Sequence, residues 1–415
     1  MTNPRTRRGA ARLAAILLVV AAAAAVVLAP ACREDDDELK IAFLADFSGP
    51  LAEFGPEIQT GVELAIQHVN DAGGVNGGHI ILVTGDTQVD PTIGVEEARR
   101  LVDVEGVHAI VGPLSSSVTI AVAESVTGEA GIPTISPSAT SPSVTVAEDN
   151  GFLFRSTISD AAQAPVLAQM VSQLGVTNVG VLYLNDAYGQ GLADGFEASY
   201  TGTATLVSLE DGQTSYLAEL EQAARGGATH LVAISFPAQA KVYIREAIEH
   251  ELFQRFVFVD GTKSEELIEE IGADFLEGSP GTAPASPDSE ASAAWDAAYV
   301  AAFGALPSRP FVREAYDATI ALALAAEAAG SFEGEAIRDQ LVAVASPGGV
   351  AVLPGAEGVR AGLEAVRDGD DVNYEGAATT LDWNADGDVT SGFVGIWAYL
   401  GGAIVEQVVV PFSLP

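Results

Sequence analysis

The stretch Ala109–Thr140, AIVGPLSSSVTIAVAESVTGEAGIPTISPSAT, decides the fold of this chain. An apolar run at 108–111 predicts a short buried strand, which Gly112-Pro113 ends. Three serines, Ser115–Ser117, then open a helical pattern, and a second short strand follows at Pro133–Ser136. This order of strand, turn, helix and strand predicts the βαβ unit of a parallel sheet.

Both predicted strands deliver small hydroxyl side chains to the carboxyl edge of that sheet. Open α/β sheets bind their ligands at this edge. Free backbone N–H groups at the helix start, together with Ser and Thr hydroxyls, suit a carboxylate. Ser116 could equally serve as the N-cap of the helix without any ligand, so the residues alone leave both interpretations open.

The start of the chain has the pattern of a secretory signal. Four arginines at positions 5, 7, 8 and 12 precede the apolar run Leu13–Leu28, and small residues follow it. A basic region, an apolar region and a small-residue site predict a signal peptide over residues 1–31. The run is too short for a comfortable membrane span.

Cys32 is the only cysteine, so the chain can form no intrachain disulfide. The sequence Ala29-Pro30-Ala31-Cys32 resembles a bacterial lipoprotein processing site, and this predicts lipidation of Cys32. Residues 32–38 then form an acidic tether, which would leave the protein outside the cytoplasm and anchored to the cell membrane. Ala29 stands where such sites prefer Leu, so plain signal cleavage stays an alternative.

The composition is strongly acidic, with 57 Asp and Glu against 19 Lys and Arg and a formal charge of −38. Such a surface repels nucleic acid and anionic lipid, so neither is expected as a partner. Solubility or a saline habitat explains the acidity as well as any acidic binding function would. Hydrophobic residues make up 48 % of the chain, enough for two cores, and the length predicts two domains.

Strands and helices alternate along the rest of the chain. Predicted strands lie at 39–45, 80–84, 152–156, 178–183, 205–209, 230–234 and 256–259, and predicted helices at 56–70, 92–104, 160–174, 238–249, 288–303, 311–329 and 335–345. Residues 278–287, rich in Pro, Ser, Gly and Ala, predict a segment that crosses between the two domains. Residues 348–371 read as irregular, and strands are expected at 378–381 and 394–400.

At this point the chain resembles a known family. The ordered motifs FSGPLAEFG (47–55), VNDAGGVNGG (69–78), DTQVDP (86–91), GPLSSS (112–117) and ISPSATSPSVT (135–145) are similar to those of the leucine/isoleucine/valine-binding proteins. Those are type I periplasmic solute-binding proteins of ABC transporters. The resemblance extends from residue 39 to about residue 407, and the ordered set of motifs carries it, since none of them is decisive alone.

The resemblance implies an α/β fold of two Rossmann-like lobes joined by three crossing segments. It places lobe 1 at 39–157 and 284–377, and lobe 2 at 158–283 and 378–415. It also implies that the protein binds an amino acid between the lobes and presents it to an ABC permease in the membrane. No cofactor and no metal are expected.

The resemblance assigns roles to the residues that should bind the ligand. Ser116 and Thr140 match hydroxyls that hold the α-carboxylate, with backbone groups of Ser138 and Ala139 beside them. Asp160 and Asp260 match the acids that hold the α-ammonium; the second is usually Glu in branched-chain binders, so Asp260 reaches less far. Tyr188, Phe54 and Phe236 match aromatic residues near the ligand, although a Tyr is common at the last position.

The residues themselves support part of this assignment. A zwitterion needs donors for its carboxylate and acids for its ammonium, and bonds to an ionised partner are about twice as strong as neutral ones. Hydroxyls on one lobe and aspartates on the other fit that division. Helix capping by Asp160 and a simple turn at Asp260 remain alternatives, as does core packing for Tyr188 and Phe236.

The sequence Asp382-Trp383-Asn384-Ala385-Asp386-Gly387-Asp388 imitates the start of an EF-hand calcium loop. Its twelfth position would be Phe393, which cannot supply the bidentate carboxylate. A simple turn between strands is therefore favoured, with a bound cation as the alternative.

An enzymatic function is not expected. The five histidines lie outside the strand-end motifs, and the chain contains neither a Gly-x-Ser-x-Gly elbow nor a His-Glu-x-x-His pattern. The alternatives to amino-acid transport are a ligand-sensing module of the same fold, or a binder of amides, urea or aromatic acids.

Overall fold

The computed structural model describes residues 38–413. The predicted signal peptide, Cys32 and all of the acidic tether except Glu38 lie outside the described residues. Within residues 38–413, no helix combines the length and the apolar character that a bilayer crossing requires.

The first lobe contains a five-stranded parallel sheet in the order β2-β1-β3-β4-β5. Its strands are β1 (Leu39–Ala45), β2 (Ile80–Asp86), β3 (Ala109–Val111), β4 (Thr134–Ser136) and β5 (Leu153–Arg155). The strand β1, LKIAFLA, lies between β2 and β3 and is apolar almost throughout because helices cover both faces of the sheet. The predicted βαβ unit is β3, helix α4 (Ser116–Val122) and β4.

Helices from two parts of the sequence pack around this sheet. They are α2 (Gly55–Asp71), α3 (Pro91–Arg100), α4, α5 (Gly128–Ala130), α12 (Glu290–Phe303), α13 (Val312–Ala329), α14 (Gly334–Val344) and α15 (Ala356–Asp368). The Ala-rich α13 packs closely along α2, and a Cβ at Gly61 would collide with the carbonyl oxygen of Val312. A small two-stranded sheet, β11 (Val350–Val352) with β12 (Val372–Tyr374), completes this lobe.

The second lobe contains the parallel sheet β7-β6-β8-β9. Its strands are β6 (Asn178–Leu184), β7 (Thr203–Leu209), β8 (His230–Ile234) and β9 (Arg255–Val257), with helices α6 (Asp160–Gln173), α7 (Ala187–Ser199), α8 (Leu217–Ala223), α9 (Pro237–Glu249), α10 (Glu266–Ile271) and α11 (Ala273–Leu276). An antiparallel sheet, β10 (Pro280–Ala285) with β13 (Ser391–Leu400) and β14 (Ala403–Ser413), joins it through the bridge between Phe258 and Gly281.

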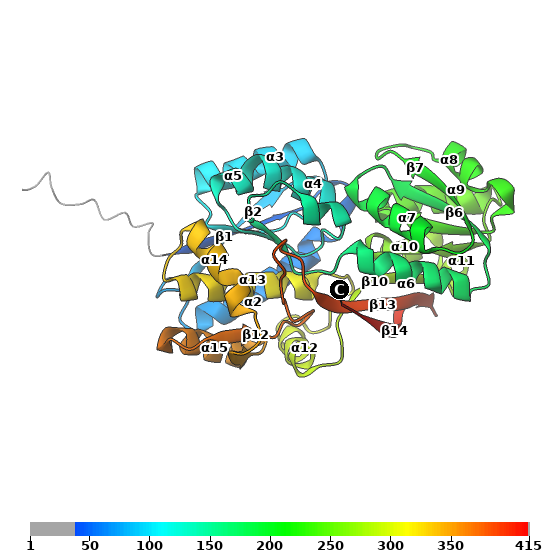
Figure 1. The fold of residues 1–415 in the computed structure, drawn as a ribbon. Coiled ribbons are helices and arrows are strands. Elements are labelled where there is room, and N and C mark those ends of the chain that lie inside the picture. The colour runs from blue at the N-terminus through cyan, green and yellow to red at the C-terminus, as the bar shows by residue number, and fades with distance from the viewer. Residues whose placement is uncertain (1–37, 414–415) are drawn as a thin grey trace, which may run out of the picture. The chain divides into compact units, whose positions relative to one another are not determined.

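The chain passes between the lobes three times. Figure 1 shows the blue and cyan elements of the first lobe, the green second lobe, the return in yellow and orange, and the red strands that end in the second lobe. The crossings follow β5, β10 and β12. The predicted α/β class, with two Rossmann-like lobes and three crossing segments, is confirmed. The residue boundaries given for the lobes remain a prediction.

Two predicted elements were wrong. Residues 348–371 are not irregular, because β11 and α15 lie there; Val359, Leu363 and Val366 form an apolar stripe that the surrounding glycines obscure in the sequence. Residues 378–381 form no strand. The N–H groups of Ala377 and Ala378 donate to the carboxylate of Asp317 on α13 instead of to a neighbouring strand.

Candidate functional site

A pocket lies between the two lobes, where strands of both sheets end. Its empty volume, which includes space open to solvent, is about 350 Å³. Its lining consists of Leu51, Phe54, Ile58, Leu114, Ser115, Ser116, Ser138 and Phe311 from the first lobe, and of Tyr188, Phe236, Asp260 and Gly261 from the second. The pocket therefore has an apolar wall, a hydroxyl cluster and a carboxylate.

The hydroxyl cluster is built by the stretch that decides the fold. A Cβ at Gly112, whose φ is +115°, would collide with the carbonyl oxygen of Leu44, so glycine lets the turn after β3 approach β1. Ser116 is the first residue of α4 and does not cap it; its Oγ accepts a hydrogen bond of 3.2 Å from the Ser141 N–H. The Oγ of Ser115 is buried with no hydrogen-bond partner among the described residues.

The turn after β4 is also held by hydroxyls. Ser138 donates from Oγ to the Leu114 carbonyl at 2.9 Å, so its side chain ties the two hydroxyl-bearing turns together. Ala139 does not line the pocket, and its N–H donates to Ser136 Oγ at 3.0 Å. Within this turn, Ser138 therefore lines the pocket, whereas Ala139 stabilises the turn itself.

Thr140 and Asp160 meet beside the pocket. The Thr140 hydroxyl donates to Asp160 Oδ2 at 2.9 Å, and the Asp160 N–H donates to the Thr140 carbonyl at 2.8 Å. Helix α6 is capped by Ser159, so the capping alternative for Asp160 does not hold. The other carboxylate oxygen, Oδ1, is buried and has no hydrogen-bond partner among the described residues. Burial, and then the nearby charge of Asp260, raise the pKa of Asp160 well above its ordinary value.

Asp260 follows β9 and lines the pocket itself. Its Oδ1 accepts from Gln163 Nε2 at 2.7 Å and from the Tyr188 hydroxyl at 3.1 Å. Burial raises the pKa of Asp260 to about 6. The Tyr188 ring stacks on Phe236 with centroids 5.5 Å apart, so these two lining aromatics pack against each other. Burial disfavours both carboxyl groups as anions and the charge of Asp260 acts on Asp160, so a cation bound at both would relieve that cost.

The structure brings most of the predicted residues together. Phe54, Ser116, Ser138, Tyr188, Phe236 and Asp260 line the pocket; Asp160 and Thr140 adjoin it through each other and through the Asp160–Asp260 charge interaction; Ala139 stands apart. Sequence reasoning missed Gln163, which orients Asp260. Gln163 lies three residues after Asp160 on α6, and that spacing placed it on the same helix face.

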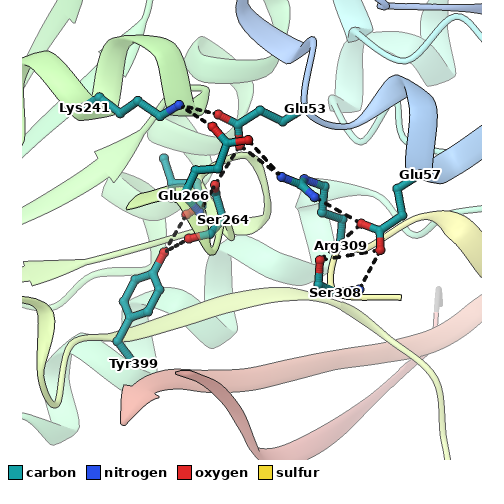
Figure 2. Close-up of polar contacts among 9 residues, drawn as sticks. Glu53, Glu57, Lys241, Ser264, Glu266, Ser308, Arg309 and Tyr399 are labelled. Carbon is teal, nitrogen blue, oxygen red and sulfur yellow. Dashed lines mark hydrogen bonds and ion pairs between the residues drawn. The ribbon is translucent and has the colours of Figure 1, made fainter. Parts of the chain in front are cut away.

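Charged residues at the pocket rim connect the lobes (Figure 2). Glu53, next to the pocket residue Phe54, pairs with Lys241 of the second lobe and accepts from Ser264 Oγ at 2.8 Å. Lys241 also pairs with Glu266 at 2.8 Å. Arg309 of the first lobe lies 3.3 Å from Glu53 and 3.5 Å from Glu266. We call Glu53, Lys241, Glu266 and Arg309 the rim network.

A second set of contacts between the lobes lies at the start of α7. The Ala187 N–H donates to Ser117 Oγ at 2.9 Å, and Ser141 Oγ donates to the Ala187 carbonyl at 2.7 Å. Both serines belong to the hydroxyl-bearing turns of the first lobe. The lobes are thus directly bonded at this point and through the rim network.

The loop that resembles an EF-hand forms a turn. Asn384 Oδ1 accepts from the N–H groups of Asp386 and Asp388. The Asp388 carboxylate is 2.6 Å from the buried guanidinium of Arg155 and accepts from Thr145 Oγ1. Among residues 38–413, no group of three or more Cys, His, Asp and Glu side chains has the arrangement of a metal site.

The chain matches the sequence model of one protein family over residues 38–373, and that family is described as periplasmic binding protein. The Leu/Ile/Val-binding protein homolog 1 of Brucella abortus is 32 % identical, covering 68 % of this chain and 76 % of the relative. A leucine-, isoleucine-, valine-, threonine- and alanine-binding protein of Pseudomonas aeruginosa is 28 % identical, covering 74 % and 82 %. The chemotactic signal transduction system substrate-binding protein BasB of Halobacterium salinarum is 26 % identical, covering 85 % of each chain.

Solved structures show the same architecture. The leucine-binding protein LivK of Thermotoga maritima has a TM-score of 0.75 at 23 % identity, with 90 % of this chain and 98 % of that one covered. LivJ of Streptococcus pneumoniae, in complex with isoleucine, has a TM-score of 0.74 at 25 % identity, covering 91 % and 99 %. A solute-binding protein of R. palustris in complex with benzoate has a TM-score of 0.70 at 19 % identity, covering 90 % and 96 %.

Fold and pocket thus define a type I periplasmic binding protein. The chain belongs to the periplasmic binding protein family, and within it to the branched-chain amino-acid-binding group of ABC substrate-binding proteins. The protein is a solute-binding protein and not an enzyme, and its family works outside the cytoplasm.

Proposed function

We propose that this protein binds an amino acid with an aliphatic side chain in the pocket between the lobes and delivers it to an ABC permease. The observation that carries the proposal is the buried Oδ1 of Asp160, which has no hydrogen-bond partner among residues 38–413, in a carboxyl group that is subject to the charge of Asp260. A buried carboxylate oxygen without a donor is costly, and the ammonium of an amino acid would supply the missing donor.

The rest of the pocket matches the other parts of such a ligand. The hydroxyls of Ser115 and Ser116 are the donors proposed for the carboxylate, with Ser138 beside them; the Thr140 hydroxyl, which donates to Asp160 in this structure, would have to turn to join them. Leu51, Phe54, Ile58, Leu114 and Phe311 offer the side chain an apolar wall opposite Tyr188 and Phe236. The names of the Brucella and Pseudomonas relatives and the isoleucine in the S. pneumoniae structure agree with this assignment.

Two alternatives share the fold. The R. palustris structure holds benzoate, an acid without an ammonium group, and two closely spaced carboxyl groups in this pocket argue against such a ligand. The Halobacterium relative is named for chemotactic signalling, which favours a sensory partner as the second candidate. The site would be the same in both roles, so growth on the amino acid as sole nitrogen source and chemotaxis toward it, both in a deletion strain, would separate them.

We also propose that residues 1–31 are removed as a signal peptide and that Cys32 carries the lipid anchor. The apolar run followed by a single cysteine supports this. Cys32→Ser should release the protein from the membrane fraction, and mass spectrometry of the native N-terminus should find a diacylglyceryl cysteine. A native N-terminus without lipid would contradict the anchor.

Thermal unfolding with a small ligand panel tests the binding function. Leucine, isoleucine and valine should raise the melting temperature by mass action, because a ligand at 100 times its Kd adds about 2.7 kcal/mol to the free energy of unfolding. Leucinamide lacks the carboxylate, and 4-methylpentanoate and benzoate lack the ammonium, so each should produce a much smaller shift. If no amino acid raises the melting temperature, the proposed function fails.

Variants of the pocket test the assigned residues. Asp160→Ala and Thr140→Ala should each abolish the leucine shift, because each removes part of the ammonium or carboxylate site. The ligand-free fold should persist. In Asp160→Ala, the removal of a buried charge offsets the loss of the hydrogen bond to Thr140. Asp194→Ala, on the exposed side of α7, is the matched control and should keep the full shift. Retained leucine binding in both pocket variants would refute the site.

A further inference from the structure

The side chain of Arg155 is buried at the end of β5 and holds the turn after β4, which lies at the pocket. Only 1 % of its surface is exposed. Arginine is rarely buried to this degree unless it has partners. Its Nη1 donates to three consecutive carbonyls, those of Ala139 at 3.3 Å, Thr140 at 3.2 Å and Ser141 at 3.0 Å. One guanidinium nitrogen therefore holds all three residues of this turn.

The charge of Arg155 is balanced from a distant part of the sequence. Asp388, which precedes β13 in the third crossing segment, lies 2.6 Å from Arg155 Nε. Thr145 closes the group, because its Oγ1 accepts from Arg155 Nη2 at 2.8 Å and donates to Asp388 Oδ2 at 2.8 Å. The main chain repeats the connection: the Arg155 N–H donates to Gly387 O, and Trp383 Nε1 donates to Arg155 O.

The turn that Arg155 holds carries the contacts of the proposed binding site. Thr140 bonds Asp160, and the Ser141 N–H bonds Ser116 Oγ. Ser141 also reaches across to the second lobe at Ala187. A shift of this turn would move the proposed carboxylate donors and an acid of the proposed ammonium site together.

We propose that Arg155 and Asp388 form a positioning pair, which holds the turn Ala139–Ser141 in its binding geometry and ties it to the third crossing segment. The pair touches no ligand itself and acts through the turn. Only the importance of this turn for binding rests on the proposed function. An arginine suits the task because its planar guanidinium can serve three carbonyls, Thr145 and a carboxylate together, whereas a lysine ammonium has three donors.

Hydrogen exchange of the ligand-free protein tests the pair without any ligand. In Asp388→Asn and in Arg155→Met, the amides of Ala139 and Ser141 should exchange at least about tenfold faster than in the wild type, because an uncompensated or missing charge loosens the turn. The amides of β6 and β8 in the second lobe should not change. Asp388→Asn preserves the shape and serves if Arg155→Met does not fold. Unchanged exchange in this turn would overturn the proposal.

Calorimetry then tests whether the pair of Arg155 and Asp388 affects the Kd for leucine. For leucine, Kd should rise by about 10–100-fold in Asp388→Asn and Arg155→Met, the range known for removing outer support around a metal site. The affinity for leucinamide, which lacks the carboxylate, should fall less. Arg155→Lys should recover only part of the leucine affinity.

A matched arginine separates positioning from general support. Arg367 also pairs with an acid, Glu327 at 2.7 Å, and also donates to two backbone carbonyls, those of Ala72 and Gly74, far along the first lobe. Arg367→Met should leave leucine binding unchanged. An equal loss of leucine affinity in Arg367→Met would reduce Arg155 to a structural residue. If the wild type binds no amino acid, the proposed function fails while the exchange experiment still decides the pair.

Discussion

Asp160 and Asp260 show how single residues shape this pocket. Both carboxyl groups are buried, and burial raises the pKa of Asp260 from its ordinary value of 3.8 to about 6 and that of Asp160 further in the same direction. A folded-state pKa above the unfolded value means that the folded protein keeps the proton longer. Raising the pH from about 4 to above 6 therefore removes stability from the ligand-free protein at these groups.

The affinity for an amino acid should change with pH in the opposite sense. A bound ammonium favours ionised carboxylates, so Kd should fall as the pH rises from 5 to 7, by up to about tenfold per pH unit for one released proton. Calorimetry in buffers of different ionisation enthalpy should record proton release near pH 6. Asp260→Asn should lose part of this dependence, and a Kd that stays constant over the range would contradict the charge assignment.

At this scale the sequence indicated the acids and hydroxyls but not their partners. Asp260, Tyr188 and Ser116 lie at or just after strand ends, and strand ends of parallel sheets meet at one edge. Which hydroxyl remains free depends on where other turns lie in space. The sequence presents Ser115 only as part of a serine run, and only the fold shows that its Oγ has no hydrogen-bond partner within the part of the chain that the structure describes.

Among the elements, helix α13 connects the first lobe to the third crossing segment. Asp317 on this helix is fully buried and accepts from the Tyr374 hydroxyl at 2.7 Å and from the N–H groups of Ala377 and Ala378 at 2.8 Å each. Burial raises the pKa of Asp317 to about 7. One carboxyl group therefore terminates the small sheet and fixes the start of the crossing.

Asp317→Ala should destabilise the protein strongly. Each buried donor left unpaired costs about 1–3 kcal/mol, and three donors lose their partner. Asp317→Asn should cost less because it keeps one acceptor oxygen. Urea unfolding measures the difference, with Asp339→Ala on the exposed side of α14 as the control. A midpoint for Asp317→Ala equal to that of the control would refute the role of Asp317 in holding the crossing.

The predictability of elements followed their burial. Long apolar strands such as β1 and β8 could be predicted because both faces of a parallel sheet are covered. Helix α15 was missed although Val359, Leu363 and Val366 recur at helical spacing, because the glycines within and around it favour a loop. The crossing at 377–381 has apolar residues but no strand partner, so its shape depends on Asp317, which lies 60 positions away from Ala377.

For the whole molecule, the rim network counters a strong charge imbalance. The chain carries a formal charge of −38, so two acidic lobes approach each other when they meet around a ligand. Lys241 and Arg309 place positive charge between Glu53 and Glu266 from opposite lobes (Figure 2). The network therefore favours the contact between lobes that traps a ligand.

Removing a cation of the rim network should weaken binding and change its response to salt. Lys241→Met should raise Kd for leucine by up to about fivefold, since partly exposed pairs contribute up to about 1 kcal/mol. The matched control is Lys263→Met, which breaks the pair with Glu406 inside the second lobe and should leave Kd unchanged. Titrations from 50 mM to 1 M NaCl (about 14 to 3 Å of Debye length) would compare the variants. A wild-type salt response in Lys241→Met would remove the rim network from the binding equilibrium.

The pairing of Arg155 with Asp388 also constrains how the protein can be made. Arg155 is translated well over two hundred residues before Asp388, and until that part of the chain has emerged the arginine has no carboxylate to meet. The sheet of the first lobe can thus form early in synthesis. The turn Ala139–Ser141, however, reaches its binding geometry only near the end of synthesis. A nascent chain stalled before residue 388 should bind no amino acid, even though it already carries every residue that lines the pocket.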